Sequence, residues 1–156
     1  MNSLIRMRGT TSVEFAIAAL VTLIILFAVI EFGRLLFVRA MLEEGARRGA
    51  RLAAVCPIGD GYVSAASRFA NEEGGSRFIP DLTPENVVVQ YLDAAGNALG
   101  TPANDPASIR YVRVSIEGYS MPLFIPLFEI TLNPASVSSI QPVESLGLTA
   151  TGAVAC

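Results

Sequence analysis

Few residues in this chain have the chemistry of an enzyme active site. The 156 residues include no histidine, and all 11 basic residues are arginines. The commonest general base, the commonest metal ligand and a lysine nucleophile are therefore missing. Glu72 and Glu73 are adjacent carboxylates, but nothing in the sequence marks a partner that would activate them, so a solvated helix end is favoured over a catalytic dyad. No phosphate-binding, dinucleotide-binding or metal-binding motif is present. We expect no enzymatic activity, no cofactor, no metal and no small-molecule substrate.

The two cysteines, Cys56 and Cys156, are the remaining reactive side chains. Two cysteines alone cannot build a structural zinc site. In an exported protein they would favour a disulfide, and in the cytosol they would stay as thiols. Such a bond would close a loop of about 100 residues, worth up to about 4–5 kcal/mol in the chain-entropy model. It would be excluded if the two Cα atoms lay more than about 7 Å apart.

Composition points to a membrane rather than to nucleic acid. The formal net charge is −3, and no cluster of basic residues occurs in the C-terminal half, which argues against a nucleic-acid partner. Hydrophobic residues make up 52% of the chain and the mean hydropathy is +0.51. A run near the N-terminus supplies the excess over the usual apolar share.

That run is uncharged between Glu14 and Glu31. Its 16 residues would span roughly 24 Å as a helix, short of the roughly 30 Å hydrocarbon core. The 21 residues from Thr10 to Ile30 would span roughly 32 Å, which is enough. A cleaved secretory signal is disfavoured, because the run is longer than the usual apolar region and no small-residue cleavage site follows it. We expect a membrane-spanning helix.

The helix is predicted to continue past the membrane. No proline occurs before Pro57, and a helical stripe of apolar and small residues extends to Cys56. Pro57 disfavours the helical state at Cys56, so the helix should run from Thr11 and end near there. Gly45 and Gly49 form a G-x-x-x-G pattern in a polar context, which favours close packing against a sheet over dimerisation in the membrane.

The N-terminal third resembles a known family. Its marks are Arg8-Gly-Thr-Thr-Ser-Val-Glu-Phe15, the apolar run, Glu31-Phe-Gly-Arg34 and Glu44-Gly-Ala-Arg-Arg-Gly-Ala-Arg51. This pattern is similar to the TadE-like family, the minor pseudopilins of tight-adherence (Flp-type) pilus systems. The resemblance covers about the first 50 residues and is loose beyond residue 55.

The resemblance implies how the chain is processed and placed. A prepilin peptidase would cut after Gly9, which makes Thr10 the new N-terminus and places Glu14 and Phe15 at the fifth and sixth positions. Residues 1–9 would be a leader, 10–33 the transmembrane part of the helix, 34–56 its periplasmic part, and 57–156 a small head. The N-terminus would lie in the cytoplasm and the head in the periplasm of the bacterial inner membrane.

The distribution of arginines predicts the opposite orientation. Arg6 and Arg8 precede the span, whereas five arginines follow it closely: Arg34, Arg39, Arg47, Arg48 and Arg51. A bare count by the positive-inside rule favours a cytoplasmic C-terminal side. The family resemblance is the reason for preferring a periplasmic head.

Glu14 has three interpretations. It could complete a capping box with Thr11 at the start of the helix. It could be recognised by the leader peptidase. It could also form an ion pair, in the plane of the membrane, with the α-amino group of a neighbouring subunit, which would offset the cost of a carboxylate in hydrocarbon.

The head is predicted to combine one helix with an antiparallel sheet. Helical spacing begins at Tyr62 and ends at Gly74-Gly75. Strands are expected at 86–92, 109–119 and 146–154, with a turn at Gly96-Asn97, and the serine- and proline-containing stretch 133–144 is expected to be a loop. The expected fold class is α+β and pilin-like, with the long helix packed on the small antiparallel sheet.

The apolar stretch Met121–Leu132 has two open interpretations. Pro122 and Pro126 prevent a long regular element there. The stretch would cover one end of the sheet, which is the favoured interpretation, or be exposed near the membrane or a partner.

Together these features favour a minor pseudopilin, a structural and assembly subunit of the pilus. Its partners would be the membrane, the prepilin peptidase, and other pilins and pseudopilins with the pilus assembly machinery. The major subunit of such systems is usually much shorter, so the long head favours a minor role. The alternative is an unprocessed single-pass anchor that carries a periplasmic binding module, and an anchored enzyme ranks third.

Overall fold

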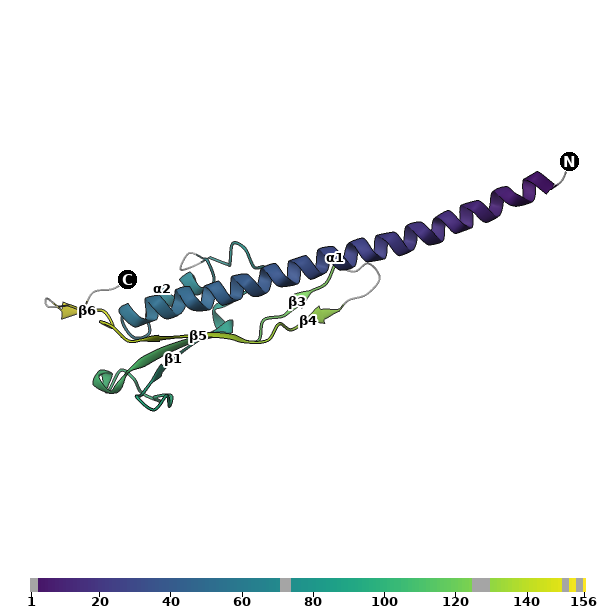
Figure 1. The fold of residues 1–156 in the computed structure, drawn as a ribbon. Helices are drawn as coiled ribbons and strands as arrows, with labels where there is room; N and C mark the ends of the chain where they lie inside the picture. Colours follow the sequence, from purple (N-terminus) through teal and green to yellow (C-terminus); the bar gives the residue numbers. More distant parts are fainter. Residues whose placement is uncertain (1–2, 71–73, 125–129, 150–151, 154–155) are drawn as a thin grey trace.

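The fold is organised around one long helix. The computed structural model describes residues 3–70, 74–124, 130–149, 152–153 and 156. Helix α1 (Ser3–Val55) is continuous over 53 residues. Its N-terminal half projects away from the rest of the chain, and its C-terminal half lies along the head (Figure 1). Because the helix begins at Ser3, Thr11 lies inside it and not at its N-cap.

The C-terminal end of α1 is held by a segment from the far end of the sequence. The helix ends at Val55, two residues before Pro57, as predicted. Its last carbonyl groups would lack partners within the helix. The backbone N–H of Glu144 donates to the carbonyl of Ala54 at 3.0 Å, and that of Gly147 donates to the carbonyl of Val55 at 2.5 Å. The end of the head is thereby fixed to the end of the helix.

A three-stranded antiparallel sheet packs on this half of α1, so the predicted α+β fold class is confirmed. Its strands are β1 (Val87–Leu92), β2 (Tyr111–Ile116) and β5 (Val137–Pro142), in the order β1-β2-β5. The central strand β2 is antiparallel to both neighbours. Its buried residues Val112, Val114 and Ile116 face the helix side of the core.

The core has two parts along the helix. One lies near Cys56, where Ala50 and Ala53 of α1 pack with Val112 and Val114 of β2. The other lies nearer the projecting half and joins α1 to the segment before β1, to the end of β2 and to β3. Its buried members are Val38, Leu42, Ala46, Ile79, Leu82, Ile116, Tyr119 and Met121.

Three sequence predictions for the head are wrong. The stretch 133–144, expected to be a loop, contains β5. Ser138 and Ile140 lie on the exposed side of this edge strand, and Pro142 ends it, which is where a sheet tolerates proline. Instead of one strand over 146–154, the structure has the two-residue strands β6 (Leu148–Thr149) and β7 (Gly152–Ala153). Helix α2 (Gly61–Ser67) ends before Gly74, because Phe69 takes a left-handed φ of 55°.

The remaining elements are short. Two single-turn 3₁₀ helices, η1 (Pro84–Asn86) and η2 (Pro106–Ser108), precede β1 and β2. The turn after β1 is built as predicted, with Gly96 at a φ of 84°. Strands β3 (Met121–Pro122) and β4 (Thr131–Leu132) pair to form a small separate hairpin. It lies beside the middle of α1 (Figure 1).

Gly45 and Gly49 allow the head to approach α1 closely. A Cβ on Gly45 would overlap the backbone oxygen of Ser67, and one on Gly49 would overlap the Ser67 hydroxyl and lie 3.1 Å from the Val114 side chain. The sequence predicted close packing against a sheet; the structure instead has Ser67 of α2 as the nearest neighbour of both glycines, with the side chains of Ile116 and Val114 of β2 farther away.

We predict that Gly45→Ala destabilises the head by about 1–3 kcal/mol, because backbone cannot move aside for the new methyl group. The midpoint of thermal unfolding, followed by circular dichroism in detergent, should fall by several degrees. Gly33→Ala is the matched control, since a Cβ there meets nothing within 4 Å. An equal midpoint in the two variants would contradict this account of the packing.

Candidate functional site

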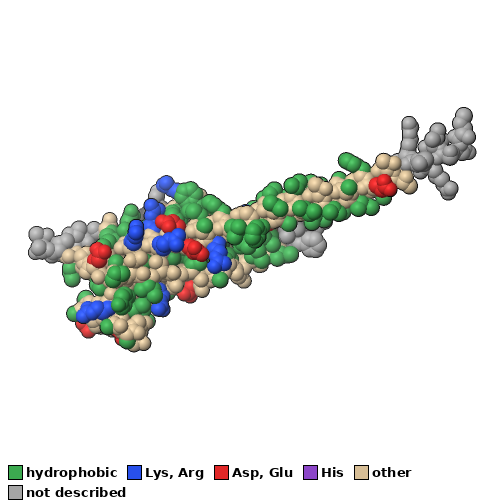
Figure 2. Space-filling view, viewed as in Figure 1, with side chains coloured by type: hydrophobic (Ala, Val, Ile, Leu, Met, Phe, Trp, Pro, Cys, Tyr) green, Lys and Arg blue, Asp and Glu red, His purple; other side chains and the backbone are tan. Residues whose placement is uncertain are grey.

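The projecting half of α1 is apolar and uncovered. By length and composition it is a candidate membrane span: its best 18-residue window, within Thr10–Val55, has a mean hydropathy of 2.8 and is 0% buried. Large side chains along it stand open, including Phe15 at 74% and Ile30 at 62% exposure. Figure 2 shows hydrophobic side chains along this half on the visible face. Nothing described in the chain itself covers this surface, so it requires lipid or another apolar partner.

The predicted processing residues lie together at the start of this surface. Gly9, Thr10, Glu14 and Phe15 all fall on α1, and the last three are exposed. Glu14 follows Gly9 by five residues, or about 7.5 Å along the helix axis. The exposed side chains of this segment are therefore accessible to another protein.

The two cysteines lie at the opposite end of the molecule. Cys56 and Cys156 are joined by a disulfide with their Cα atoms 5.7 Å apart, and Cys56 is fully buried. About 63 Å of helix separates Cys56 from Glu14. The predicted site residues therefore form two separate groups. Among the described residues, which do not include Glu72 and Glu73, no group of three or more His, Cys, Asp or Glu side chains could hold a metal ion.

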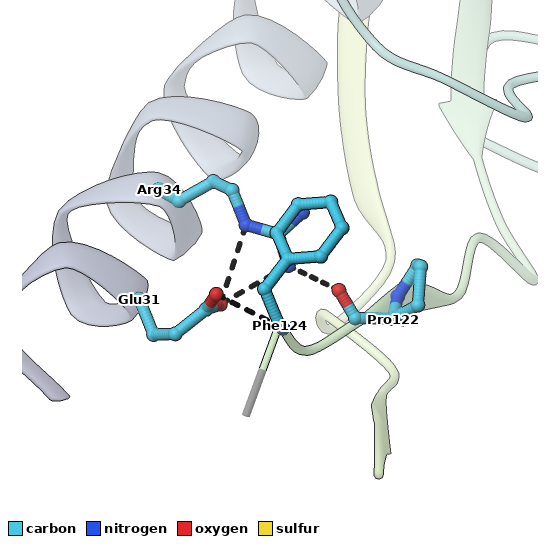
Figure 3. A network of polar contacts seen from close by, with 4 residues as sticks. All are labelled: Glu31, Arg34, Pro122 and Phe124. Atoms are coloured by element: carbon cyan, nitrogen blue, oxygen red, sulfur yellow. Dashed lines mark hydrogen bonds and ion pairs between the residues drawn. The ribbon is translucent and has the colours of Figure 1, made fainter. Parts of the chain in front are cut away.

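A polar junction between α1 and the β3–β4 hairpin lies between these two groups (Figure 3). The carboxylate of Glu31 accepts a hydrogen bond from the guanidinium of Arg34 at 3.0 Å and another from the backbone N–H of Phe124 at 3.0 Å. Arg34 also donates to the carbonyl of Pro122. Its guanidinium carbon lies 4.3 Å from the centroid of the Phe124 ring.

The junction provides partners for Glu31 and Arg34, the first charged residues after the uncharged run, where an unpaired charge would be costly. Glu31 is 8% exposed and directly follows the uncharged run. A buried carboxylate is strongly unfavourable unless it is paired and hydrogen-bonded, and here one cation and one N–H do both. Behind the junction, burial raises the pKa of Tyr119, the charge of Asp81 adds to that effect, and the charge of Arg34 opposes it.

Sequence reasoning used Glu31 and Arg34 only as part of a motif and missed their contact with the hairpin. The signal available was the i,i+3 spacing of opposite charges at the end of an apolar run. The partner, the backbone at Phe124, lies 93 residues further along the chain. No local pattern could have indicated it.

Sequence reasoning also missed an arginine-rich hollow on the head. This open hollow, of about 810 Å³, lies over the head end of α1, where Figure 2 shows basic side chains gathered. Its basic lining residues are Arg47, Arg48, Arg51 and Arg77. Arg47 pairs with Glu44 at 3.1 Å, and Arg48 lies 5.4 Å from the centroid of the Phe69 ring. Two of the four arginines that line the hollow therefore already have contacts within the fold.

Residues 9–51 match the model of the TadE-like protein family. This segment is similar to TadE-like proteins. The match begins at Gly9, includes Glu14, Glu31 and Arg34, and ends at Arg51, so it contains the uncovered helix and the helix side of the junction but none of the sheet. It confirms the resemblance and associates the chain with tight-adherence pilus systems. No curated protein and no solved structure shows a significant match.

We predict that Glu31→Ala loosens the β3–β4 hairpin from the TadE-like helix. Losing a hydrogen bond to a charged acceptor costs about 1.5–3 kcal/mol, which corresponds to roughly 10- to 150-fold faster exchange of the Phe124 amide hydrogen. Hydrogen–deuterium exchange of peptides covering 119–124 measures this.

The control for this experiment is Glu43→Ala. Glu43 pairs with Arg39 at 3.3 Å, but both side chains are well exposed, at 42% and 60%. An exposed pair of this kind contributes little, so exchange near Phe124 should stay as in the parent protein. Unchanged exchange in Glu31→Ala would show that the junction does not hold the hairpin.

Proposed function

We propose that the protein is a minor pseudopilin, a structural subunit that takes part in assembly of a tight-adherence type IV pilus and is cut by a prepilin peptidase between Gly9 and Thr10. One observation carries the proposal: the TadE-like match begins at Gly9 and covers an apolar helix that the chain leaves uncovered. An uncovered helix of this kind is suited to a bilayer before assembly and to packing among other pilin helices after it.

The membrane would hold residues 10–33 of α1. The 21 residues from Thr10 to Ile30 reach roughly 32 Å, close to the thickness of the hydrocarbon core. The Glu31–Arg34 junction follows at once and joins the helix to the head. The periplasmic part of the helix, residues 34–56, is then the part that packs on the head, 57–156.

The disulfide supports a periplasmic head. Disulfides form and persist in oxidising compartments such as the periplasm and are rare in the bacterial cytosol. The disulfide joins Cys56, which follows the last residue of α1, to Cys156 in the head. This argument is independent of the family resemblance, and it opposes the bare count of arginines on the two sides of the span.

Glu14 would act in assembly. Its side chain is exposed on α1, four residues after Thr10, which would be the N-terminus of the cut chain. A carboxylate in the hydrocarbon region is unfavourable by up to about 2.5–3.5 kcal/mol on insertion scales. Cleavage after Gly9 creates an α-amino group at Thr10, and the amino group of a neighbouring subunit would neutralise Glu14 and fix the relative height of the two helices.

We predict that co-expression with a prepilin peptidase produces a chain that begins at Thr10, as read by N-terminal sequencing. Gly9→Leu should remain uncut, because the new side chain occupies the position next to the scissile bond. Gly33→Ala, which changes a glycine outside the leader, should be cut as the parent is. An intact Met1 in the parent would favour the alternative, an unprocessed anchor that carries a periplasmic binding module.

We predict that Glu14→Ala stays in the membrane but enters pili poorly. Carbonate extraction measures membrane insertion, and the amount of the protein in a sheared pilus fraction measures assembly. Glu43→Ala removes an exposed carboxylate of the same helix beyond the membrane and should assemble normally. N-terminal sequencing of Glu14→Ala separates a defect in cutting from a defect in assembly, and normal assembly would exclude the ion pair.

A further inference from the structure

The β3–β4 hairpin changes from buried to exposed over a few residues. Met121 is 1% exposed and belongs to the core, and Leu123 is partly buried against the same core. Phe124 is 69% exposed, and Ile130, on the other arm of the hairpin, is 45% exposed. One end of the hairpin therefore covers the core, as the favoured sequence interpretation expects, and the other presents large apolar side chains outward.

These exposed side chains lie where α1 passes from its uncovered half to its covered half. The Phe124 ring stacks on Arg34, and its N–H bonds to Glu31 (Figure 3). The same stretch of helix exposes Phe32 at 61% and Phe37 at 51%. Exposed apolar side chains of the helix therefore occur in the same stretch of α1 that contacts the hairpin.

The hairpin and the residues around it also contain few charged side chains. Between Gly118 and Val143 the sequence contains one charged residue, Glu129. The backbone N–H of Leu123 donates to the carbonyl of Ile130 at 2.9 Å, and that of Phe124 donates to Glu31. Backbone groups with partners of this kind lower the cost of entering a region poor in water.

We propose that the exposed end of the hairpin is a second membrane-contacting element, with Phe124 and Ile130 seated among the lipids of the leaflet that faces the head. The proposal rests on the membrane anchorage proposed above. Lipid is the occupant because the hairpin contacts α1 at Glu31 and Arg34, directly after the apolar run that is proposed to span the membrane. Phenylalanine is among the apolar residues that interfacial segments bury at the boundary between headgroups and acyl chains. The contact would fix the head's orientation against the bilayer before assembly.

The sequence contains no tryptophan, so a single introduced tryptophan reports on one place. The probe is Phe124→Trp in the full chain, reconstituted into phosphatidylcholine vesicles with or without brominated acyl chains. We expect blue-shifted emission that bromine quenches by about half or more, because the ring lies within the roughly 5–10 Å deep interfacial layer. We expect the same result for Ile130→Trp, on the other arm of the hairpin. Agreement between the two variants would show that the quenching does not come from local disruption by one substitution.

Two further variants calibrate the result. Phe27→Trp places the probe within the proposed span, so bromine should quench its emission. Phe78→Trp places the probe on the head, at a ring that is 54% exposed and packed on Phe69, so bromine should not quench it. If the Phe27→Trp probe is quenched but neither hairpin probe is, the anchor stands and the hairpin proposal is overturned. Blue-shifted but unquenched hairpin probes would place protein there instead of lipid and overturn it equally. An unquenched probe in the Phe27→Trp variant would overturn the anchorage and this proposal with it.

Discussion

One helix in this protein has to be stable in two surroundings, and the rest of the structure follows from that constraint. The run of α1 between Glu14 and Glu31 is apolar on all sides and is left uncovered, whereas the second half of the helix buries a face of small residues and exposes most of its charged side chains. Such a helix needs a defined position at which the uncovered part ends and the part that packs on the head begins. Glu31 and Arg34 provide it, because they place the first charges after the apolar run in a hydrogen-bonded junction with the head.

The small residues of α1 determine how the head is built. Gly45 and Gly49 let Ser67 of α2 approach the helix backbone, and Ala46, Ala50 and Ala53 continue the same face beneath β2. Larger residues would hold the sheet further away and open space in the core. The G-x-x-x-G spacing, well known in membrane dimers, serves contact within one chain here.

The sequence was informative where local physics decides the structure. Pro57 set the end of α1, β-branched residues placed β1, and the apolar run identified the uncovered half of the helix. It was misleading where tertiary context decides. The stretch containing Val137 and Ile140 looked like a loop because of its serines and prolines, yet pairing with β2 makes it an edge strand. The contact of Glu31 with the backbone at Phe124 depends on the chain returning to the helix after 93 residues, which no spacing records.

The head is attached to α1 at both ends of their contact, through the junction at Glu31 and through the hydrogen bonds and disulfide near Val55 and Cys56. This half of the helix is therefore supported along its length by the head, while the half before Glu31 projects without support from the described part of the head (Figure 1). Bending stiffness is therefore unequal along α1. If packing against neighbouring helices bent α1, the bend would form before Glu31. The structure of the head would then stay unchanged.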